Sequence, residues 1–254
     1  MQYDAPNERH KEFVLNIKNY FNQESSQTIF KKRNTIKVVN FEGNQYVVKS
    51  FKIPHFLNKI IYKFFRDSKA KRSFENSWKL SKLNINTPKP IGYIEFPSIF
   101  MFHESYYISE FFDYDFEIRA VFQDKKFKDR EIILKSFIEF SYQLHQKNVY
   151  HVDYSPGNIL VKQNAHGYEF SIIDVNRMKF IPFTNELRMK NLSKLTNDEA
   201  DNTFMAKYYA IIAKQNEESL MKLFQVSLKE EEQYLNNKKR LKKLKKFPIP
   251  KLFS

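Results

Sequence analysis

The chain has 254 residues, of which 42% are hydrophobic and 17% aromatic, so it can form one domain or two lobes with packed cores and is not a disordered chain. Lysine and arginine total 43 against 29 acidic residues, and the net charge of +14 favours polyanionic partners such as nucleic acid, acidic membranes or phosphorylated substrates. The absence of cysteine excludes disulfides, thiolate zinc sites and thiol catalysis.

The N-terminal residues 1–13 are rich in charge and lack the apolar segment of a secretory signal. No uninterrupted apolar run approaches the ~18 residues that a membrane span requires. We therefore expect a cytoplasmic protein, either soluble or peripheral to a membrane.

The first half of the chain is predicted to be rich in strands. Residues 35–41 and 46–51 are mainly β-branched and aromatic and flank a short turn containing Gly43, which predicts a β-hairpin. A helix is predicted over residues 68–80, because apolar residues such as Phe74 recur there near helical spacing.

Two further strands are predicted beyond a pair of prolines that end this helix, over residues 91–96 and 106–112. The acidic turn 113–115 follows them and marks a boundary. We therefore expect a β-rich N-terminal lobe over residues 1–112.

The second half of the chain is predicted to be mainly helical, over residues 113–237. One helix shows a buried face at i, i+4, i+7 and i+11, with Asp129 as its N-cap; the face consists of Ile133, Phe137, Phe140 and Leu144. Two short strands are predicted next, at 159–161 and 170–173, around a turn containing Gly167. Two more helices are expected, one opening at Asp198 and Glu199 and one around residues 220–228.

The segment His151-Val-Asp-Tyr-Ser-Pro-Gly-Asn158, with the later Asp174, carries the chemistry that the sequence predicts. A polar loop after a buried helix holds Asp153 and Asn158 five residues apart, and a hairpin of apolar strands delivers Asp174 to the same place. Phosphoryl transfer needs a carboxylate to orient the attacking hydroxyl and oxygen ligands that fix Mg²⁺ on the phosphates. These residues supply both.

The pattern H-x-D-x-x-x-x-N, followed by apolar strands and an Asp, resembles the catalytic and metal-binding loops of the protein-kinase-like superfamily. The resemblance implies ATP and Mg²⁺ as cofactors, Asp153 as catalytic base, and Asn158 and Asp174 as metal ligands. His151 would brace the loop, and Pro156-Gly157 would form a sharp turn before Asn158. The implied fold is α+β: a bilobal protein-kinase-like fold, with an N-terminal antiparallel sheet lobe containing one helix and a mainly helical C-terminal lobe.

The same resemblance gives roles to residues of the N-terminal lobe. Lys49 lies in a strand similar to the kinase V-A-I-K strand, where a lysine pairs with the α- and β-phosphates and with a helix glutamate. Glu75 is the only acid between Asp67 and Glu95, and we assign it as that glutamate. No glycine-rich loop is present, so Lys31, Lys32 and Arg33 are expected to stand over the phosphates, and Glu110 is a further candidate at the nucleotide.

The chain departs from protein kinases, because the third motif is Asp174-Val-Asn176 rather than D-F-G and no A-P-E sequence follows. It resembles more specifically the lipopolysaccharide kinase family of Kdo/WaaP type, over roughly residues 30 to 230. The supporting stretches are 33–36, 68–75, 86–92, 151–158 and 173–178. The resemblance implies transfer of phosphate to a sugar hydroxyl, that of Kdo on a lipid A precursor, at the cytoplasmic face of the inner membrane.

The C-terminal tail, 238–254, begins with seven basic residues between 238 and 246, interrupted by Leu241 and Leu244. Polybasic segments gain about 1 kcal/mol per Lys or Arg near an anionic membrane. We expect the tail to be attracted to the membrane or to an anionic glycolipid. The alternatives are a solvated tail and a nucleic-acid contact, and no nucleic acid is expected as partner.

Two rival functions remain open at this point. A small-molecule kinase of aminoglycoside or choline type would use the same Asp153, Asn158 and Asp174, but the excess of positive charge favours an anionic acceptor. A catalytically inactive kinase fold could bind a partner through its basic surface, although every polar group that catalysis requires is present.

Overall fold

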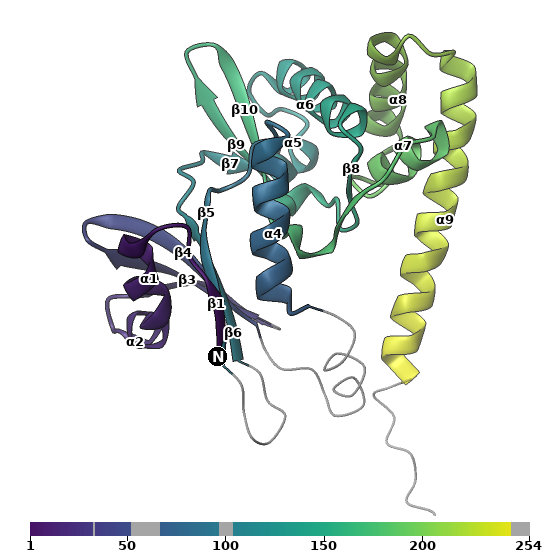
Figure 1. Ribbon diagram of the computed structural model, residues 1–254. Coiled ribbons are helices and arrows are strands. Elements are labelled where there is room, and N and C mark those ends of the chain that lie inside the picture. Colours follow the sequence, from purple (N-terminus) through teal and green to yellow (C-terminus); the bar gives the residue numbers. More distant parts are fainter. Residues whose placement is uncertain (33, 52–66, 97–103, 245–254) are drawn as a thin grey trace, which may run out of the picture. The chain divides into compact units, whose positions relative to one another are not determined.

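The structure, a computed structural model, describes residues 1–32, 34–51, 67–96 and 104–244 (Figure 1). The chain forms two compact units: residues 1–117 with 158–178 make the first, and residues 118–157 with the chain from 179 onward make the second. The first unit thus includes the segment that carries Asn158 and Asp174, which a division at residue 112 places elsewhere.

The first unit contains two antiparallel sheets, of order β1-β5-β6-β4-β3-β2 and β10-β9-β7. The strands of the larger sheet are β1 (Gln2–Asp4), β2 (Gln27–Lys31), β3 (Asn34–Phe41), β4 (Asn44–Phe51), β5 (Pro90–Phe96) and β6 (Glu104–Glu110). Those of the smaller sheet are β7 (Phe116–Glu117), β9 (Ile159–Asn164) and β10 (Gly167–Ile172).

The predicted hairpin is confirmed, with β3 and β4 paired from Phe41 and Asn44 outward. The two residues between them, Glu42 and Gly43, have φ angles of +47° and +77°. Two central residues with positive φ are what a type I′ hairpin turn requires, and its twist matches that of the flanking strands. The local turn chemistry therefore fixes the register of the strand that carries Lys49.

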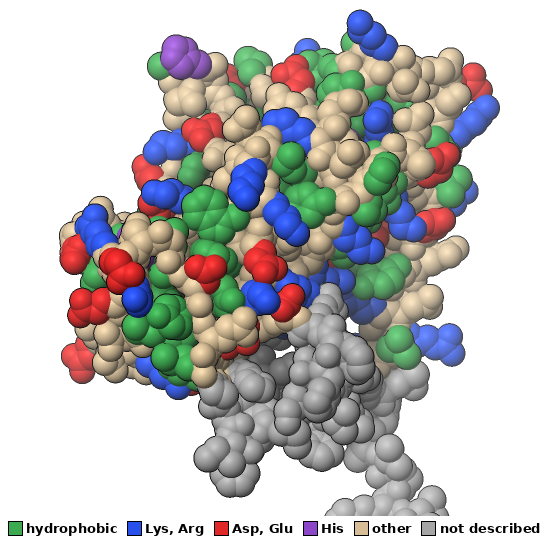
Figure 2. All heavy atoms as spheres, viewed as in Figure 1, with side chains coloured by type: hydrophobic (Ala, Val, Ile, Leu, Met, Phe, Trp, Pro, Cys, Tyr) green, Lys and Arg blue, Asp and Glu red, His purple; other side chains and the backbone are tan. Residues whose placement is uncertain are grey.

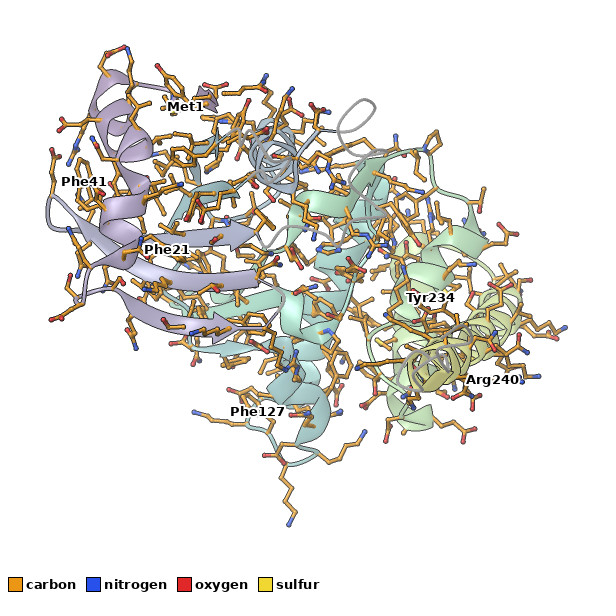
Figure 3. The ribbon with its side chains drawn as sticks, turned by 90° about the horizontal axis from the view of Figure 1, so that it is seen from below. Met1, Phe21, Phe41, Phe127, Tyr234 and Arg240 are labelled. Atoms are coloured by element: carbon orange, nitrogen blue, oxygen red, sulfur yellow. The ribbon has the colours of Figure 1, made fainter. Side chains whose placement is uncertain are left out.

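Two N-terminal helices, α1 (Glu8–Leu15) and α2 (Ile17–Asn22), pack on one face of the larger sheet. Phe13 stacks on Phe41 with ring centroids 4.5 Å apart, and Phe21 belongs to the same buried cluster (Figure 3). Only one helix was expected in this lobe, so that prediction was wrong in number. The signal was present, since apolar residues recur at positions 13, 17 and 21.

The opposite face of this sheet packs on α4 (Lys69–Lys82), the helix that was predicted, whose N-cap Ser68 accepts a hydrogen bond from Lys71 N. Phe51 of β4 and Phe74 of α4 share a buried cluster. Side chains alternate along a strand, so Lys49 points to the same face as Phe51, and its Nζ lies 5.4 Å from that ring centroid. The sheet therefore presents Lys49 on the side of α4.

The second unit is mainly helical, as predicted, with a short strand pair β8 and β11. Its elements are α5 (Ile118–Gln123), α6 (Arg130–Gln146), β8 (Val149–His151), β11 (Met178–Phe180), α7 (Asn185–Leu192), α8 (Glu199–Ala213) and α9 (Glu217–Leu244). The predicted face of α6 is buried at three positions, whereas Phe140 is only half-buried. Asp198 caps α8 by accepting from Asp201 N, but the side chain of Asp129 makes no capping hydrogen bond.

Helix α9 is much longer than the helix predicted around residues 220–228 and includes the first part of the basic segment. Its N-terminal part buries Leu220 and Phe224, and it packs on α7 and α8. The C-terminal part, which carries Tyr234 and Arg240 (Figure 3), is exposed. Within the described ranges, no helix has both the length and the apolar character that a membrane crossing needs.

Candidate active site

The first unit brings Lys49 and Asp174 together, although 125 residues separate them in sequence. The Lys49 ammonium forms an ion pair with Asp174 Oδ1, and the lysine side chain is only 12% exposed. The β9–β10 hairpin delivers Asp174 to this place, because Ile159 pairs with Ile172. Just beyond that pair, Ile173 N donates to Asn158 O at 3.0 Å. The predicted hairpin is thus confirmed, and it brings the segment before Asp174 against the backbone of Asn158.

The backbone of Asp174 is left-handed, with φ 58° and ψ 45°, a conformation uncommon outside glycine but tolerated best by Asp and Asn. Two amides hold it there. Asn176 Nδ2 donates to Asp174 Oδ1 at 2.6 Å, and Asn76 Nδ2 of α4 donates to Val175 O at 2.7 Å. The aspartate carboxylate and the turn behind it are therefore fixed from α4 and from the 3₁₀ turn η3 (Val175–Arg177).

The sequence did not predict that Asn176 and Asn76 hold the Asp174 turn. Asn176 occupies the third position of the Asp-Val-Asn motif, where protein kinases have glycine, and the motif by itself indicates no role for it. Asn76 had no signal at all, because its partner Val175 lies 99 residues away in sequence.

The predicted pair between Lys49 and Glu75 is not formed, and Lys49 meets Asp174 instead. The Glu75 carboxylate lies 3.9 Å from Lys71 Nζ and is 44% exposed. The reason is helix register: Phe74 faces the sheet and Asn76 faces the Asp174 turn, which leaves Glu75 on the outer side of α4.

The remaining nucleotide candidates lie at or just beyond the ends of strands of the larger sheet. Glu110 ends β6 and accepts from Lys89 Nζ at 2.8 Å, while its backbone N donates to Lys89 O. Lys31 ends the exposed edge strand β2, and Lys32 Nζ lies 5.8 Å from the centroid of Phe30. Arg33 lies outside the described residues.

The second unit carries Asp153 on a loop that follows β8. The residues around it are buried: His151 is 1% exposed, and Tyr154 is fully buried with its hydroxyl 2.8 Å from Ser141 Oγ. His151 Nδ1 accepts from Asp153 N at 3.1 Å, which assigns the proton of a neutral imidazole to Nε2. Two buried side chains thus anchor the loop, and Asp153 between them stays half-buried.

The predicted sharp turn at Pro156-Gly157 is a 3₁₀ turn, η2 (Pro156–Asn158). Gly157 is required for space and not for a left-handed φ. A Cβ at this position would lie 1.7 Å from Arg119 Nη2, so the glycine lets the Arg119 guanidinium lie directly on the loop backbone.

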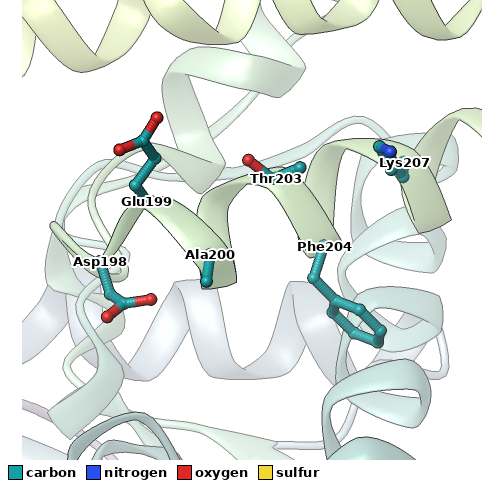
Figure 4. Close-up of a pocket in the computed structure, with 6 residues that line it drawn as sticks. All are labelled: Asp198, Glu199, Ala200, Thr203, Phe204 and Lys207. Atoms are coloured by element: carbon teal, nitrogen blue, oxygen red, sulfur yellow. The ribbon is translucent and has the colours of Figure 1, made fainter.

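A hollow on α8 is lined by none of the residues predicted for the active site (Figure 4). It is lined by Asp198, Glu199, Ala200, Thr203, Phe204 and Lys207. Asp198 caps the helix and pairs with Lys125 Nζ at 2.7 Å, so its carboxylate already serves the fold. We assign no catalytic role to this hollow.

A buried histidine beneath the Asp153 loop makes stability depend on pH. Burial lowers the pKa of His145 from 6.5 to about 3, with Arg188 acting in the same direction and Asn191 opposing. Because the folded-state pKa is depressed, the stabilisation is complete above pH 6.5 and is lost as pH falls from there toward 3. The slope reaches about 1.4 kcal/mol per pH unit. Urea unfolding between pH 7.5 and 4.5 should show it.

His145→Gln removes the titration and is expected to flatten this pH dependence relative to the wild type. Carboxylates elsewhere titrate equally in both proteins, so the difference between the two slopes isolates the histidine. Equal slopes would show that His145 is not the group responsible.

The protein combines an antiparallel sheet with a mainly helical part, and a lysine of the sheet forms an ion pair with an aspartate at the end of a β-hairpin. This combination defines the protein-kinase-like fold. The sequence matches the lipopolysaccharide kinase (Kdo/WaaP) family over residues 22–222. The chain belongs to this family, as its motifs predicted, and is a kinase.

One solved structure supports the fold. The chain is similar to "WaaP in complex with acyl carrier protein", with a TM-score of 0.64 and 13% identity over 92% of this chain and 99% of that one. It also matches a co-crystal structure of WbdD with the kinase inhibitor LY294002, with a TM-score of 0.47 and 18% identity over 83% of this chain and 47% of that one. A comparison with curated proteins finds no match.

Proposed function

We propose that the protein transfers the γ-phosphate of ATP to a sugar hydroxyl of the lipopolysaccharide inner core, with Kdo on a lipid A precursor as acceptor. The observation that carries this proposal is the Lys49–Asp174 pair beside Asn158, in a chain of the lipopolysaccharide kinase family. The family implies ATP as phosphate donor and a glycolipid as the class of acceptor. The excess of basic residues suits such an anionic acceptor.

The donor groups near Asp174 fit Mg²⁺. A carboxylate from Asp174 and an amide carbonyl from Asn158 are hard oxygen ligands, and Mg²⁺ in kinases is held by one or two such groups together with the substrate phosphates. When bound, the cation neutralises negative charge on those phosphates. Asn176 and Asn76 prepare this site by fixing the Asp174 turn before any ligand arrives.

The chain's own residues divide the remaining work. Lys49 places an ammonium where the α- and β-phosphates would lie, Asp153 accepts the proton of the attacking sugar hydroxyl, and His151 holds the loop. Arg33 and Glu110 complete the proposed nucleotide site.

The acceptor is tested by phosphate transfer from radiolabelled ATP. Transfer to Kdo-lipid A and not to aminoglycosides or choline is the expected result. Transfer to one of those soluble amines alone would retire the lipopolysaccharide assignment in favour of a small-molecule kinase. In cells lacking the protein, mass spectrometry of the lipopolysaccharide core should show the loss of one phosphate.

We also propose that the end of α9 meets an anionic membrane surface, on the cytoplasmic face of the inner membrane. Tyr234 and Leu241 are seven residues apart, hence on one helix face, and are 55% and 59% exposed. Basic residues surround them at Lys238, Lys239, Arg240 and Lys242. On the face shown in Figure 2, by contrast, cationic side chains are interspersed with acidic ones. An apolar stripe with cationic flanks is typical of interfacial helices.

Replacing Lys238, Lys239 and Arg240 with glutamine together is expected to weaken binding to phosphatidylglycerol-containing vesicles by about 3 kcal/mol, or about 100-fold. Vesicle co-sedimentation measures the effect. A control with glutamine at Lys207, Lys222 and Lys229 removes the same charge elsewhere and should bind like wild type. Equal binding of all three proteins would refute the membrane proposal.

A further inference from the structure

Three consecutive backbone carbonyls of the loop that carries Asp153 are each hydrogen-bonded within the second unit. His151 O accepts from Asn191 Nδ2 at 2.9 Å, and Val152 O accepts from Lys194 Nζ at 2.8 Å. Asp153 O accepts from Ser155 N at 2.7 Å. A loop on the surface of a unit could leave these groups to water, so their complete use by the protein makes this backbone unusually well held.

The peptide group between Val152 and Asp153 is held at both of its polar ends. Lys194 binds its carbonyl oxygen, and His151 Nδ1 accepts its N–H at 3.1 Å. A peptide group is planar, so fixing both ends fixes the plane and with it the direction in which the Asp153 Cα–Cβ bond leaves the chain. The two contacts therefore help to set the direction in which the Asp153 side chain points.

The polar contacts of Lys194 are with this loop and with the strand that precedes it. Its Nζ also lies 3.0 Å from the Tyr150 hydroxyl and 4.8 Å from the centroid of that ring, and among the described residues no carboxylate pairs with it. A hydrogen bond from a charged donor is stronger than one from a neutral donor. Buried Leu192 and Leu195 on either side anchor the segment from which Lys194 reaches the loop.

Asn191 and Lys194 differ in what else they hold. Asn191 is fully buried, and its Oδ1 lies 3.2 Å from His145 Nε2, whose ring also contacts the Tyr209 hydroxyl. It is part of the core, and its loss would disturb folding. Lys194 is half-buried, and the contacts of its ammonium are with Val152 O and Tyr150, so its role can be separated from stability more readily than that of Asn191.

We propose that Lys194 is a positioning residue for catalysis: it orients Asp153 through the Val152 carbonyl. The proposal rests on the proposed role of Asp153 as base. It requires no contact between Lys194 and either substrate.

Lys194→Met tests it, because methionine keeps an unbranched stem and removes the ammonium. The variant is expected to lose 10- to 100-fold in kcat, since a displacement of about 1 Å at a reacting group costs this much. KM for ATP should stay within about 2-fold, because Lys49, Asn158 and Asp174 belong to the other unit. Lys194→Arg retains a cationic donor and should recover at least part of kcat.

Two controls complete the experiment. Lys190→Met removes a lysine of α7 that pairs with Glu230 at 2.7 Å, and Tyr150→Phe removes only the second contact of Lys194. Both should keep wild-type kcat.

The outcomes separate the two proposals. Loss of kcat in Lys194→Met with its melting temperature unchanged, and rescue by arginine, supports the positioning role. Wild-type kcat in Lys194→Met, or a loss that follows a lowered melting temperature and is not rescued by arginine, overturns it. If Asp153→Ala retains full activity, the proposed function itself fails. Should wild type not phosphorylate Kdo-lipid A, its ATP hydrolysis serves as the same readout.

Discussion

Asp153→Ala is expected to lower kcat for phosphate transfer by about 10²- to 10⁴-fold, the usual contribution of a positioned general base. ATP binding should change little, because the groups proposed to bind nucleotide lie in the first unit and Asp153 lies in the second. Folding should also persist, since the loop is anchored by buried His151 and Tyr154 and not by the Asp153 side chain. Steady-state kinetics together with ATP titration measure both quantities.

Asp124→Asn is the matched control for this variant. Asp124 also lies in the second unit, and its carboxylate accepts a local hydrogen bond from Lys126 N at 2.8 Å. Its kcat should equal that of wild type. Unchanged transfer in Asp153→Ala would instead favour the rival function, a kinase fold that binds a partner without catalysis.

Asp174→Ala is expected to lower kcat/KM by about 10²- to 10³-fold, as removal of a single preorganised electrostatic group does in other enzymes. Unlike Asp153→Ala, it should also weaken Mg·ATP binding, because it removes the only carboxylate proposed as metal ligand. Lys49, at 12% exposure, loses its ion-pair partner as well. Calorimetric titration with Mg·ATP, compared with ATP in chelator, separates the cation's contribution.

Asp113→Asn controls for loss of an acid in the first unit. Asp113 pairs with Lys162 at 2.9 Å, but its side chain is 82% exposed, and ion pairs between exposed side chains contribute little to stability. Its affinity for Mg·ATP should equal that of wild type. If Asp174→Ala bound Mg·ATP as tightly as this control, Asp174 would not be a metal ligand.

Local patterns made much of the fold predictable from sequence. The β3–β4 hairpin follows from β-branched and aromatic segments around a glycine turn, and the β9–β10 hairpin follows from two short apolar strands. The superfamily was predictable from the spacing of Asp153, Asn158 and Asp174, and the family from the stretches 33–36, 68–75, 86–92, 151–158 and 173–178.

Contacts between distant residues could not be predicted in this way. The sequence placed Glu75 on α4 but did not determine which side of the helix it faces. Consecutive residues of a helix point about 100° apart, so Asn76 faces the Asp174 turn and Glu75 does not. Lys194 shows the same difficulty, since nothing local marks a lysine whose partner is a backbone carbonyl 42 residues earlier. Side-chain to backbone contacts leave no charge pattern in a sequence.

The Lys49–Asp174 pair has a consequence for how ligands would enter. The two charges that are proposed to receive a triphosphate and a divalent cation neutralise each other in the free protein. A cation arriving alone would have to displace the Lys49 ammonium from Asp174, and a nucleotide arriving without metal would have to draw the ammonium away from that carboxylate. Under the proposed roles, joint arrival would give each of the two charges a ligand partner of opposite sign in place of their mutual ion pair.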